Sequence, residues 1–230
     1  MNAFVGLAGR GALQSNLEES DERDYYFRLS DIELLKTLLC FGPEDADGSA
    51  MAQELMQEFG DINKLMAARP SKLTKYNNRC ENISVKIKVL EAIGHRMAQA
   101  RILKVPVLSN WDDLLVYLRV KMSHKNVEQL RVLHLDRENG LIADELQSVG
   151  TIDHVPVYPR EILLRAIELN SAALIIAHNH PSGNPLPSES DIEMTYRIST
   201  ACRALGVILH DHIIVGNGSV FSFRKEGLLI

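Results

Sequence analysis

Apolar residues recur at helical spacing through the first half of the chain. In the longest such segment, Ile83, Ile87, Leu90 and Met97 fall on one face of a helix that begins after Asn82. Ser30 stands directly before another apolar segment, in the position of a helix N-cap. The pattern predicts several helices that pack as a small all-α bundle over residues 28–103.

The pattern changes near residue 107, and strands and helices alternate from there on. Apolar runs at residues 130–135 and 172–177 have the length of strands, and Asn139-Gly140 predicts a hairpin turn after the first of them. Amphipathic segments predict helices at residues 111–122, 159–169 and 189–205. This alternation predicts an α/β domain with a mixed sheet over residues 108–230.

The first residues and the cysteines bear on the class of protein. Residues 1–27 contain several glycines, and we expect a mobile tail there. No apolar run has the length of a bilayer-spanning helix, and no signal pattern opens the chain, so we expect no membrane segment. Cys40, Cys80 and Cys202 are odd in number and far apart, which favours reduced thiols in a cytoplasmic protein.

The charge distribution limits how the chain could bind nucleic acid. A formal net charge of −5 argues against a protein that binds DNA mainly through the electrostatic attraction of its net charge. One stretch of the N-terminal half is nevertheless basic, and its cations are Lys72, Lys75, Arg79, Lys86 and Lys88. They form either a solvated helical face or a nucleic-acid contact surface.

The segment from His178 to Asp191 combines two imidazoles, a hydroxyl and a carboxylate. His178 and His180 continue the apolar run at residues 172–177 at a spacing of two, so both rings leave the same face of a strand. A proline-rich turn follows, and Ser188 is a natural N-cap for a helix that carries Asp191 in its first turn. Two neutral imidazoles and one carboxylate suit a zinc ion that keeps a fourth position open for water. The segment therefore predicts one Zn²⁺ per chain, bound by His178, His180 and Asp191.

Structural explanations stand beside this metal hypothesis. Ser188-x-x-Asp191 is also a relative of the Ser-x-x-Glu capping box, and His178 also suits a buried histidine at a strand end. His210-Asp211-His212 fits either another metal site or a strand with one polar face. No nearby acid or thiol completes a ligand set there, so we expect Asp211 and His212 to support the ligands or the fold. We expect no metal binding by the isolated histidines His95, His124, His134 and His154.

The C-terminal half resembles the RadC family of bacterial proteins. The resemblance runs from about residue 108 to residue 230 and rests on His178-x-His180-Pro181 and Ser188-x-x-Asp191, together with flanking motifs. These motifs are Asn179-His180-Pro181-Ser182-Gly183, Gly150-Thr151, Pro159-Arg160-Glu161 and Asp211-His212. It implies the mixed-sheet MPN fold of JAMM metallopeptidases, related to cytidine deaminases. Tyr158 departs from the family, which usually has His before Pro-Arg-Glu.

The resemblance also implies a helix-hairpin-helix-like region within residues 28–103. Residues 29–35 and Phe59-Gly60 match such a region. The hairpin does not, because residues 76–82 lack the Gly-hydrophobic-Gly turn that presents backbone amides to a phosphate. Without those glycines the backbone approaches a phosphate poorly.

Two further roles come from the resemblance. In JAMM peptidases a glutamate on an earlier strand is the general base, and the matching residue is Glu128. Ser188 would hydrogen-bond the water or the developing oxyanion. From the residues alone, Glu128 would be a solvated glutamate at a strand start, and Glu145 and Glu161 are rival bases.

The activity implied is that of a zinc-dependent hydrolase that cleaves a peptide, isopeptide or other amide bond in a peptide or protein substrate. One alternative is a non-catalytic protein that binds partners in DNA repair or recombination. Another is a zinc-dependent enzyme acting on nucleic acid, with contacts through the basic stretch at residues 72–88.

Overall fold

The chain divides into two compact units, Met1–Ile87 and Lys88–Ile230. The computed structural model describes residues 22–39, 48–78, 80, 82–103, 105–150 and 157–229. Cys40, Arg79 and His154 lie outside these ranges, as do residues 1–21 of the expected tail. Residues 22–27, which the sequence also places in that tail, belong instead to the helix Glu22–Arg28.

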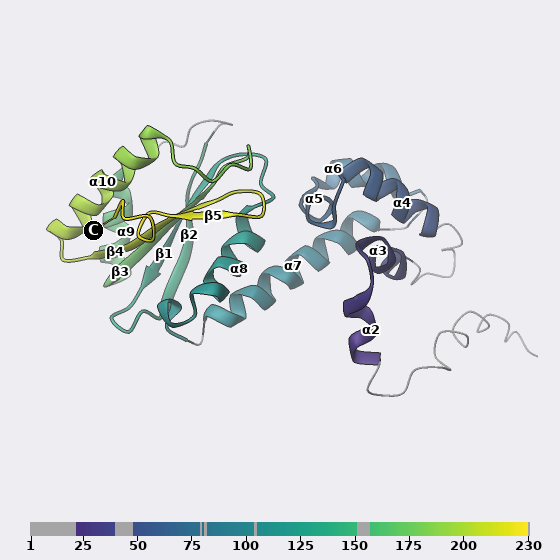
Figure 1. The fold of residues 1–230 in the computed structure, drawn as a ribbon, viewed down its shortest axis with the longest axis horizontal. Helices are drawn as coiled ribbons and strands as arrows, with labels where there is room; N and C mark the ends of the chain where they lie inside the picture. Colours follow the sequence, from purple (N-terminus) through teal and green to yellow (C-terminus); the bar gives the residue numbers. More distant parts are fainter. Residues whose placement is uncertain are drawn as a thin grey trace, which may run out of the picture. The chain divides into compact units, whose positions relative to one another are not determined.

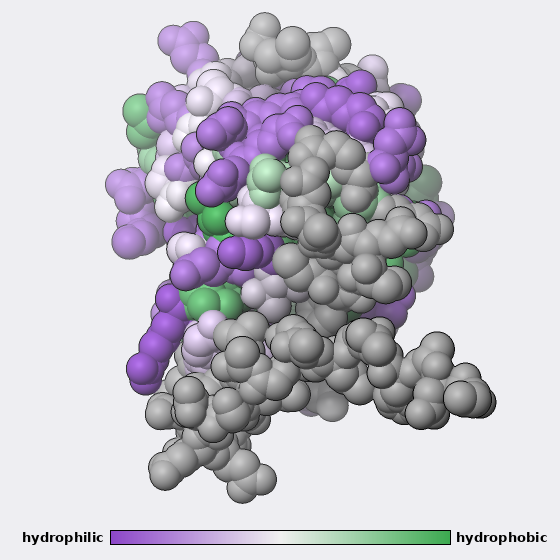
Figure 2. All heavy atoms as spheres, turned by 90° about the vertical axis from the view of Figure 1, so that its right-hand side faces the viewer, coloured by the Kyte–Doolittle hydropathy of each residue, from purple (hydrophilic) through white to green (hydrophobic). Residues whose placement is uncertain are grey.

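Short helices build the N-terminal unit, as the apolar spacing predicts (Figure 1). They are α2 (Glu22–Arg28), α3 (Asp31–Leu39), α4 (Gly48–Phe59), α5 (Ile62–Ala67), α6 (Pro70–Leu73), the 3-10 helix η1 (Thr74–Tyr76) and the start of α7 (Ile83–Ile102). Leu35, Leu55 and Leu73 are completely buried between them. The residues coloured in the view of Figure 2 are mainly hydrophilic, with small apolar areas between them.

The division between the two units lies inside α7 and not near residue 107, where the sequence pattern places it. Ile83 and Ile87, in the first turns of α7, belong to the core of the N-terminal unit. Ala98 and Ile102, near its end, belong to a core of the C-terminal unit. The boundary is displaced because a single long helix supplies apolar residues to two separate cores.

The C-terminal unit is built on a five-stranded mixed sheet with the order β2-β1-β3-β4-β5. Its strands are β1 (Gln129–Leu135), β2 (Leu141–Val149), β3 (Ala173–Asn179), β4 (Ile208–Val215) and β5 (Val220–Ser222). Its helical elements after α7 are η2 (Val107–Ser109), α8 (Trp111–Met122), α9 (Pro159–Glu168) and α10 (Glu189–Ala204). Strands β3 and β4 run parallel through the α10 crossover, whereas β1 pairs antiparallel with both β2 and β3. The expected α/β fold with a mixed sheet is confirmed.

Helices cover both faces of this sheet (Figure 1). On one face, α9 and α10 pack on alternate residues of the strands, such as Val132, Ile176 and Ile214. On the other face, α8 packs on the intervening residues, such as Leu133 and Ile175. Every residue of β3 is buried as a result, which explains why its sequence is apolar without alternation.

Two features of the described residues bear on the class of protein. None of their helices combines the length and the apolar character that a bilayer crossing requires. Cys80 and Cys202 are both buried, and burial raises the pKa of the Cys202 thiol to about 11. A thiol with so high a pKa stays protonated near neutral pH and is a poor nucleophile.

Candidate metal centre

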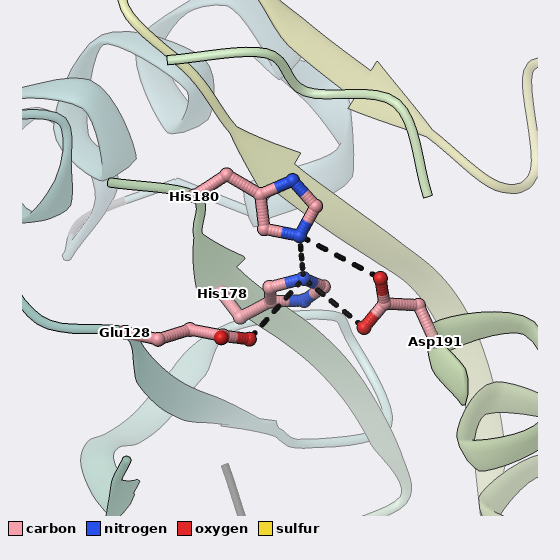
Figure 3. Close-up of side chains that lie close together, drawn as sticks. All are labelled: Glu128, His178, His180 and Asp191. Carbon is pink, nitrogen blue, oxygen red and sulfur yellow. Dashed lines mark hydrogen bonds and ion pairs between the residues drawn. The ribbon is translucent and has the colours of Figure 1, made fainter. Parts of the chain in front are cut away.

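Four side chains converge at one end of the sheet in the C-terminal unit (Figure 3). His178 lies near the end of β3 and His180 directly follows that strand, whereas Asp191 lies in the first turn of α10. Glu128 comes just before β1. One ligand atom from each of the four residues lies within 4.8 Å of the others. The structure thus brings the three predicted ligands and the predicted general base together.

The pairing of β1 with β3 explains why Glu128 reaches this position. The two strands are antiparallel, and Leu130 lies opposite His178. Moving two residues back along β1 corresponds to moving two residues forward along the neighbouring chain, which brings Glu128 beside His180. Since side chains alternate along a strand, Glu128 faces the same side of the sheet as the two histidines.

The start of α10 orients Asp191. Ser188 is the N-cap, and its Oγ accepts a hydrogen bond from the backbone nitrogen of Asp191 at 3.2 Å. Asp191 returns a bond by accepting from the backbone nitrogen of Ser188 at 2.8 Å, which completes the predicted capping box. The Ser188 hydroxyl also donates to Oδ2 of Asp191 at 2.6 Å. The same pair of residues therefore caps the helix and aims a carboxylate at the histidines.

The separations between the ligand atoms fit a metal ion. Tetrahedral zinc, with bonds of about 2.0–2.1 Å, keeps its ligand atoms about 3.3 Å apart. Nε2 of His178 lies 2.9 Å from Nε2 of His180 and 3.3 Å from Oδ1 of Asp191. Nε2 of His180 lies 3.5 Å from Oδ2 of Asp191. Three ligands at these distances can share one ion without a large rearrangement.

A chain of hydrogen bonds determines which nitrogen of His178 carries its proton. The Thr195 hydroxyl donates to the backbone carbonyl of Asp191 at 2.6 Å and so accepts from Nδ1 of His212 at 2.5 Å. Burial lowers the pKa of His212 well below its usual value, so this ring is neutral and its Nε2 carries a lone pair. That Nε2 lies 2.7 Å from Nδ1 of His178 and accepts a hydrogen bond from it. His178 therefore presents an unprotonated Nε2 to the centre of the site.

His180 presents the same nitrogen for a similar reason. Its Nδ1 donates to the backbone carbonyl of Asn184 at 2.8 Å, which leaves Nε2 as the free ring nitrogen. Two unprotonated Nε2 atoms separated by 2.9 Å repel each other, because neither has a hydrogen to donate. A cation shared between His178 and His180, either a metal ion or a proton, removes this repulsion. The donor set therefore fits a bound metal ion.

The electrostatics of the site favour the ligand states that metals require. Burial lowers the pKa of His178 to about 4, so its imidazole is neutral near pH 7. Burial alone would raise the pKa of Asp191, but hydrogen bonds from His180, when its Nε2 carries a proton, and from Ser188 hold it well below its usual range. The interaction with Asp191 raises the pKa of His180. A metal ion therefore competes mainly with a proton on His180.

Glu128 is buried, with 8% of its surface exposed, and is not the solvated glutamate that its sequence context alone suggests. Its Oε1 lies 3.9 Å from Nε2 of His178. The two other glutamates considered as general bases form ion pairs with arginines. Glu145 pairs with Arg165 at 2.7 Å, and Glu161 pairs with Arg160 at 3.2 Å.

The His210-Asp211-His212 segment divides into separate roles. Nε2 of His210 contacts the side-chain oxygen of Asn139 at 2.7 Å, away from the site. Asp211 accepts bonds from the backbone nitrogens of His212 at 2.7 Å and Arg224 at 2.9 Å, and from the Ser222 hydroxyl. Asp211 thus joins β4 to the chain after β5, and only His212 touches a predicted ligand.

The expectation that His95 and His124 are isolated is wrong. The structure places both beside Glu91, with ligand atoms within 4.8 Å of one another. The reason is tertiary, because α7 and the end of α8 pack together although about thirty residues separate their histidines. His134 instead contacts the Ser171 hydroxyl at 3.1 Å.

Two of the basic residues proposed for nucleic-acid contact are held in ion pairs. Lys75 pairs with Glu58 at 2.7 Å, and Lys88 pairs with Glu91 at 2.8 Å. Nζ of Lys86 lies 3.5 Å from Sγ of Cys80. Lys72 is exposed, and Arg79 lies outside the described residues.

Two residues that support the site carry no prediction of their own from the sequence. Thr195 lies four positions after Asp191, so one turn of helix places it on the same face, and this spacing could have predicted that Thr195 lies near Asp191.

Asn179 lies between the two histidines and faces the other side of the sheet. It accepts from the backbone nitrogen of Gln129 at 2.9 Å and donates to the carbonyls of Lys125 and Val127. Asn179 therefore holds the segment that carries Glu128 against β3.

Comparison with known proteins identifies the family of this chain. The RadC-like JAB domain family matches residues 108–228. A UPF0758 protein of Ruegeria pomeroyi is 50% identical over 201 residues, which cover 87% of this chain and 90% of that protein. A UPF0758 protein of Rhodobacter capsulatus is 48% identical over 201 residues, covering 87% of this chain and 94% of the relative. The chain therefore belongs to the RadC family, and its C-terminal unit contains a RadC-like JAB domain.

Proposed function

We propose that the chain is a zinc-dependent hydrolase that cleaves a peptide, isopeptide or other amide bond. The observation that carries this proposal is a buried carboxylate, Glu128, beside two imidazoles whose Nε2 atoms converge on Asp191. Two histidines and one carboxylate leave a fourth tetrahedral position for water, as catalytic zinc sites do. We also propose the reducing cytoplasm as its compartment, because Cys202 is a buried free thiol.

His178, His180 and Asp191 would hold the zinc ion. When bound, the ion supplies a Lewis acid and lowers the pKa of a coordinated water toward neutrality. The chain's own residues keep the three ligands in place. The His212–Thr195 chain keeps the proton of His178 on Nδ1, and Asn184 does the same for His180.

Glu128 is the general base and then the general acid in this proposal. Its carboxylate accepts a proton from the attacking water as the water oxygen bonds to the amide carbon. It returns that proton to the nitrogen as the carbon–nitrogen bond breaks, which gives a carboxylic acid and an amine. The 3.9 Å between Oε1 of Glu128 and Nε2 of His178 is longer than the distances among the three ligands, which suits a base better than a fourth ligand.

Ser188 has a different role from the one that the resemblance implies. Its single hydroxyl proton is donated to Oδ2 of Asp191, so it orients a ligand in this geometry. Stabilising an oxyanion would require that hydroxyl to turn away from Asp191. We therefore propose that Ser188 acts mainly through the position of the Asp191 carboxylate.

The proposal is tested with Glu128→Gln, a change that removes the base and keeps the size of the side chain. The purified variant and the wild type are incubated with a defined mixture of synthetic peptides and isopeptide-linked peptides, and products are identified by mass spectrometry. We expect Glu128→Gln to retain its zinc while cleavage falls by about 10²–10⁴-fold. His178→Ala is expected to lose both zinc and cleavage.

Glu161→Gln is the matched control, because Glu161 is half exposed and pairs with Arg160 outside the site. It should cleave at the wild-type rate. A zinc-loaded wild type that cleaves none of the substrates, or Glu128→Gln at full activity, would overturn the proposal. Zinc content is measured by elemental analysis in every sample, so a failure of metal binding is distinguished from a failure of catalysis.

A further inference from the structure

A second group of metal-ligand side chains lies in the C-terminal unit, apart from the candidate metal centre. Glu91 and His95 lie on α7, and His124 follows the end of α8. Ligand atoms of the three residues lie within 4.8 Å of one another, and Nε2 of His124 lies 3.3 Å from Oε1 of Glu91. The rings of His95 and His124 are nearly parallel, with centroids 6.0 Å apart.

Local geometry and packing explain this convergence. Glu91 and His95 are four residues apart on a helix, so their side chains leave the same face one turn apart. Ala98 of α7 and Leu118 of α8 are buried in the same core, which brings the end of α8 beside that face. His124, two residues after the end of α8, then lies within reach of Glu91 and His95.

Each of the two imidazoles has a buried nitrogen that lacks a hydrogen bond among the described residues, although Nε2 of His124 lies close to the Glu91 carboxylate. Nε2 of His95 and Nε2 of His124 are both buried without a hydrogen-bond partner among the described residues. The side chain of His124 is 9% exposed. An unsatisfied buried ring nitrogen normally has an explanation, and a missing ion is one of them.

The protonation of these rings suits metal binding. Burial lowers the pKa of His124 to about 4, and the nearby charge of Lys125 acts in the same direction. Burial also lowers the pKa of His95, and its ring bonds to the backbone of Val120. Both rings are therefore neutral near pH 7 and hold lone pairs that can coordinate a cation.

We propose that Glu91, His95 and His124 form a second binding site for a divalent transition metal of the zinc type. Two imidazole nitrogens and one carboxylate oxygen are a donor set that Zn²⁺ and Co²⁺ accept and that Mg²⁺ and Ca²⁺ do not prefer. Oε1 of Glu91 is the coordinating oxygen, since Oε2 is held by Lys88 at 2.8 Å. The inference does not depend on the proposed hydrolysis.

Neighbouring lysines tune this site. Nζ of Lys125 lies 3.7 Å from Oε1 of Glu91, and Lys121 also acts on the pKa of His95. Their positive charges oppose a divalent cation, so this site binds more weakly than the candidate metal centre. Binding requires the Lys125 ammonium to move away from Glu91.

The position of the second site connects it to Glu128. His124 lies four residues before Glu128, and Asn179 holds the backbone of the intervening Lys125 and Val127. An ion shared by Glu91, His95 and His124 would tie α7 to the start of this segment. The second ion would therefore stabilise the position of the segment that leads to the general base, Glu128.

Cobalt binding to the full-length chain tests the proposal. Metal-free protein is dialysed against Co²⁺, and bound metal is counted by elemental analysis. We expect about two equivalents in the wild type and about one in either His178→Ala or His124→Asn, because each variant removes a ligand from one site. The double variant His178→Ala/His124→Asn should bind none. In the His178→Ala background, Co²⁺ should raise the Tm, and His124→Asn should abolish that rise.

Two additional variants serve as controls, one for misfolding of His124→Asn and one for the loss of a histidine outside both sites. Glu91→Gln removes the carboxylate with almost no change in size and should reproduce the loss seen with His124→Asn if that variant fails to fold. His210→Asn is the matched control, because His210 is half-buried and bonds to Asn139 outside both groups. A wild type that binds a single equivalent, lost in His178→Ala, would overturn the proposal. The His178→Ala variant is expected to keep one equivalent of Co²⁺. If the double variant His178→Ala/Glu91→Gln still binds that equivalent, the proposal is also overturned.

Discussion

Nδ1 of His178 lies 2.7 Å from Nε2 of His212, behind the ring nitrogen that faces the candidate metal position. His212 is completely buried and bonds in turn to Thr195, whose hydroxyl donates to the backbone of Asp191. Two predicted ligands are thus joined through two residues that touch no metal. This arrangement orients His178 and keeps its Nε2 unprotonated.

Replacing Thr195 should therefore weaken metal binding without changing a ligand. Thr195→Val preserves the shape of the side chain but removes the hydroxyl that accepts a hydrogen bond from Nδ1 of His212. We expect the affinity for Zn²⁺ to fall by about 10–100-fold, as measured by competition with a chromophoric chelator. Thr195→Ser keeps the hydroxyl and should bind zinc like the wild type. Equal affinities for the valine and serine variants would contradict the proposed role of the hydrogen-bond chain.

The Asn179 side chain should contribute strongly to stability. It is 1% exposed, and three of its bonds satisfy backbone groups of residues 125–129. Asn179→Ala leaves those groups unpaired, so we expect the free energy of unfolding to fall by about 2–4 kcal/mol in urea titrations. Asn184→Ala is the matched control, since its side chain makes an exposed bond to Leu186, and it should change the free energy by less than about 1 kcal/mol. Equal effects of the two alanine substitutions would refute this assignment.

Gly216 allows the chain between His180 and Ser188 to approach β4. A Cβ at this position would overlap the carbonyl oxygen of Gly183 and come within 3.0 Å of Pro185. Gly216→Ala should therefore displace the segment that holds His180 and lower the free energy of unfolding by about 1–3 kcal/mol, with weaker zinc binding. Gly94→Ala is the control, because no atom beyond its own chain neighbours and helix backbone lies within 4 Å of its added Cβ. It should be neutral or stabilise α7 by up to about 1 kcal/mol. Thermal melts and zinc titrations of both variants check this expectation.

The metal-free protein should lose stability as the pH falls from about 6.5 to 4. Burial lowers the pKa of His178 and of His124 to about 4 in the folded chain, whereas unfolded histidines titrate near 6.5. Between these values the unfolded state binds more protons, so the free energy of unfolding rises with pH and falls on acidification. His178 alone corresponds to about 3 kcal/mol. His180 acts in the opposite direction, because its pKa is raised and protonation stabilises its folded form.

Urea unfolding in the presence of EDTA at pH 7 and pH 5 measures this loss. His178→Ala should show a shallower pH dependence than the wild type, because it lacks one of the groups that resist protonation. A wild-type free energy of unfolding that is equal at both pH values would contradict the buried, neutral state of His178.

Much of the candidate metal centre was predictable because its ligands are placed by local rules. His178 and His180 share a face since strand side chains alternate, and Asp191 points back over the start of α10 because Ser188 caps it. The same local periodicity predicted the helices around residues 83–102 and 111–122 and the hairpin at Asn139-Gly140. Each of these features depends on residues within about one or two turns of one another.

Glu128 illustrates what the residues alone left open. Its local context suggests a solvated side chain, and only the family resemblance singled it out. The antiparallel pairing of β1 with β3 buries it beside His180, fifty-two residues away. The buried support from Asn179 to residues 125–129 depends on the same pairing.

The chain by itself thus determined the order of its helices and strands, its α/β class and the three side chains suited to a metal, because periodicity and capping act between near neighbours. Tertiary structure alone decided that α7 serves two cores, that Thr195 and His212 orient His178, and that Glu91, His95 and His124 meet. These relationships depend on strand register and on the packing of helices distant in sequence. Both are set by the burial of apolar faces across the whole unit, which no local pattern contains.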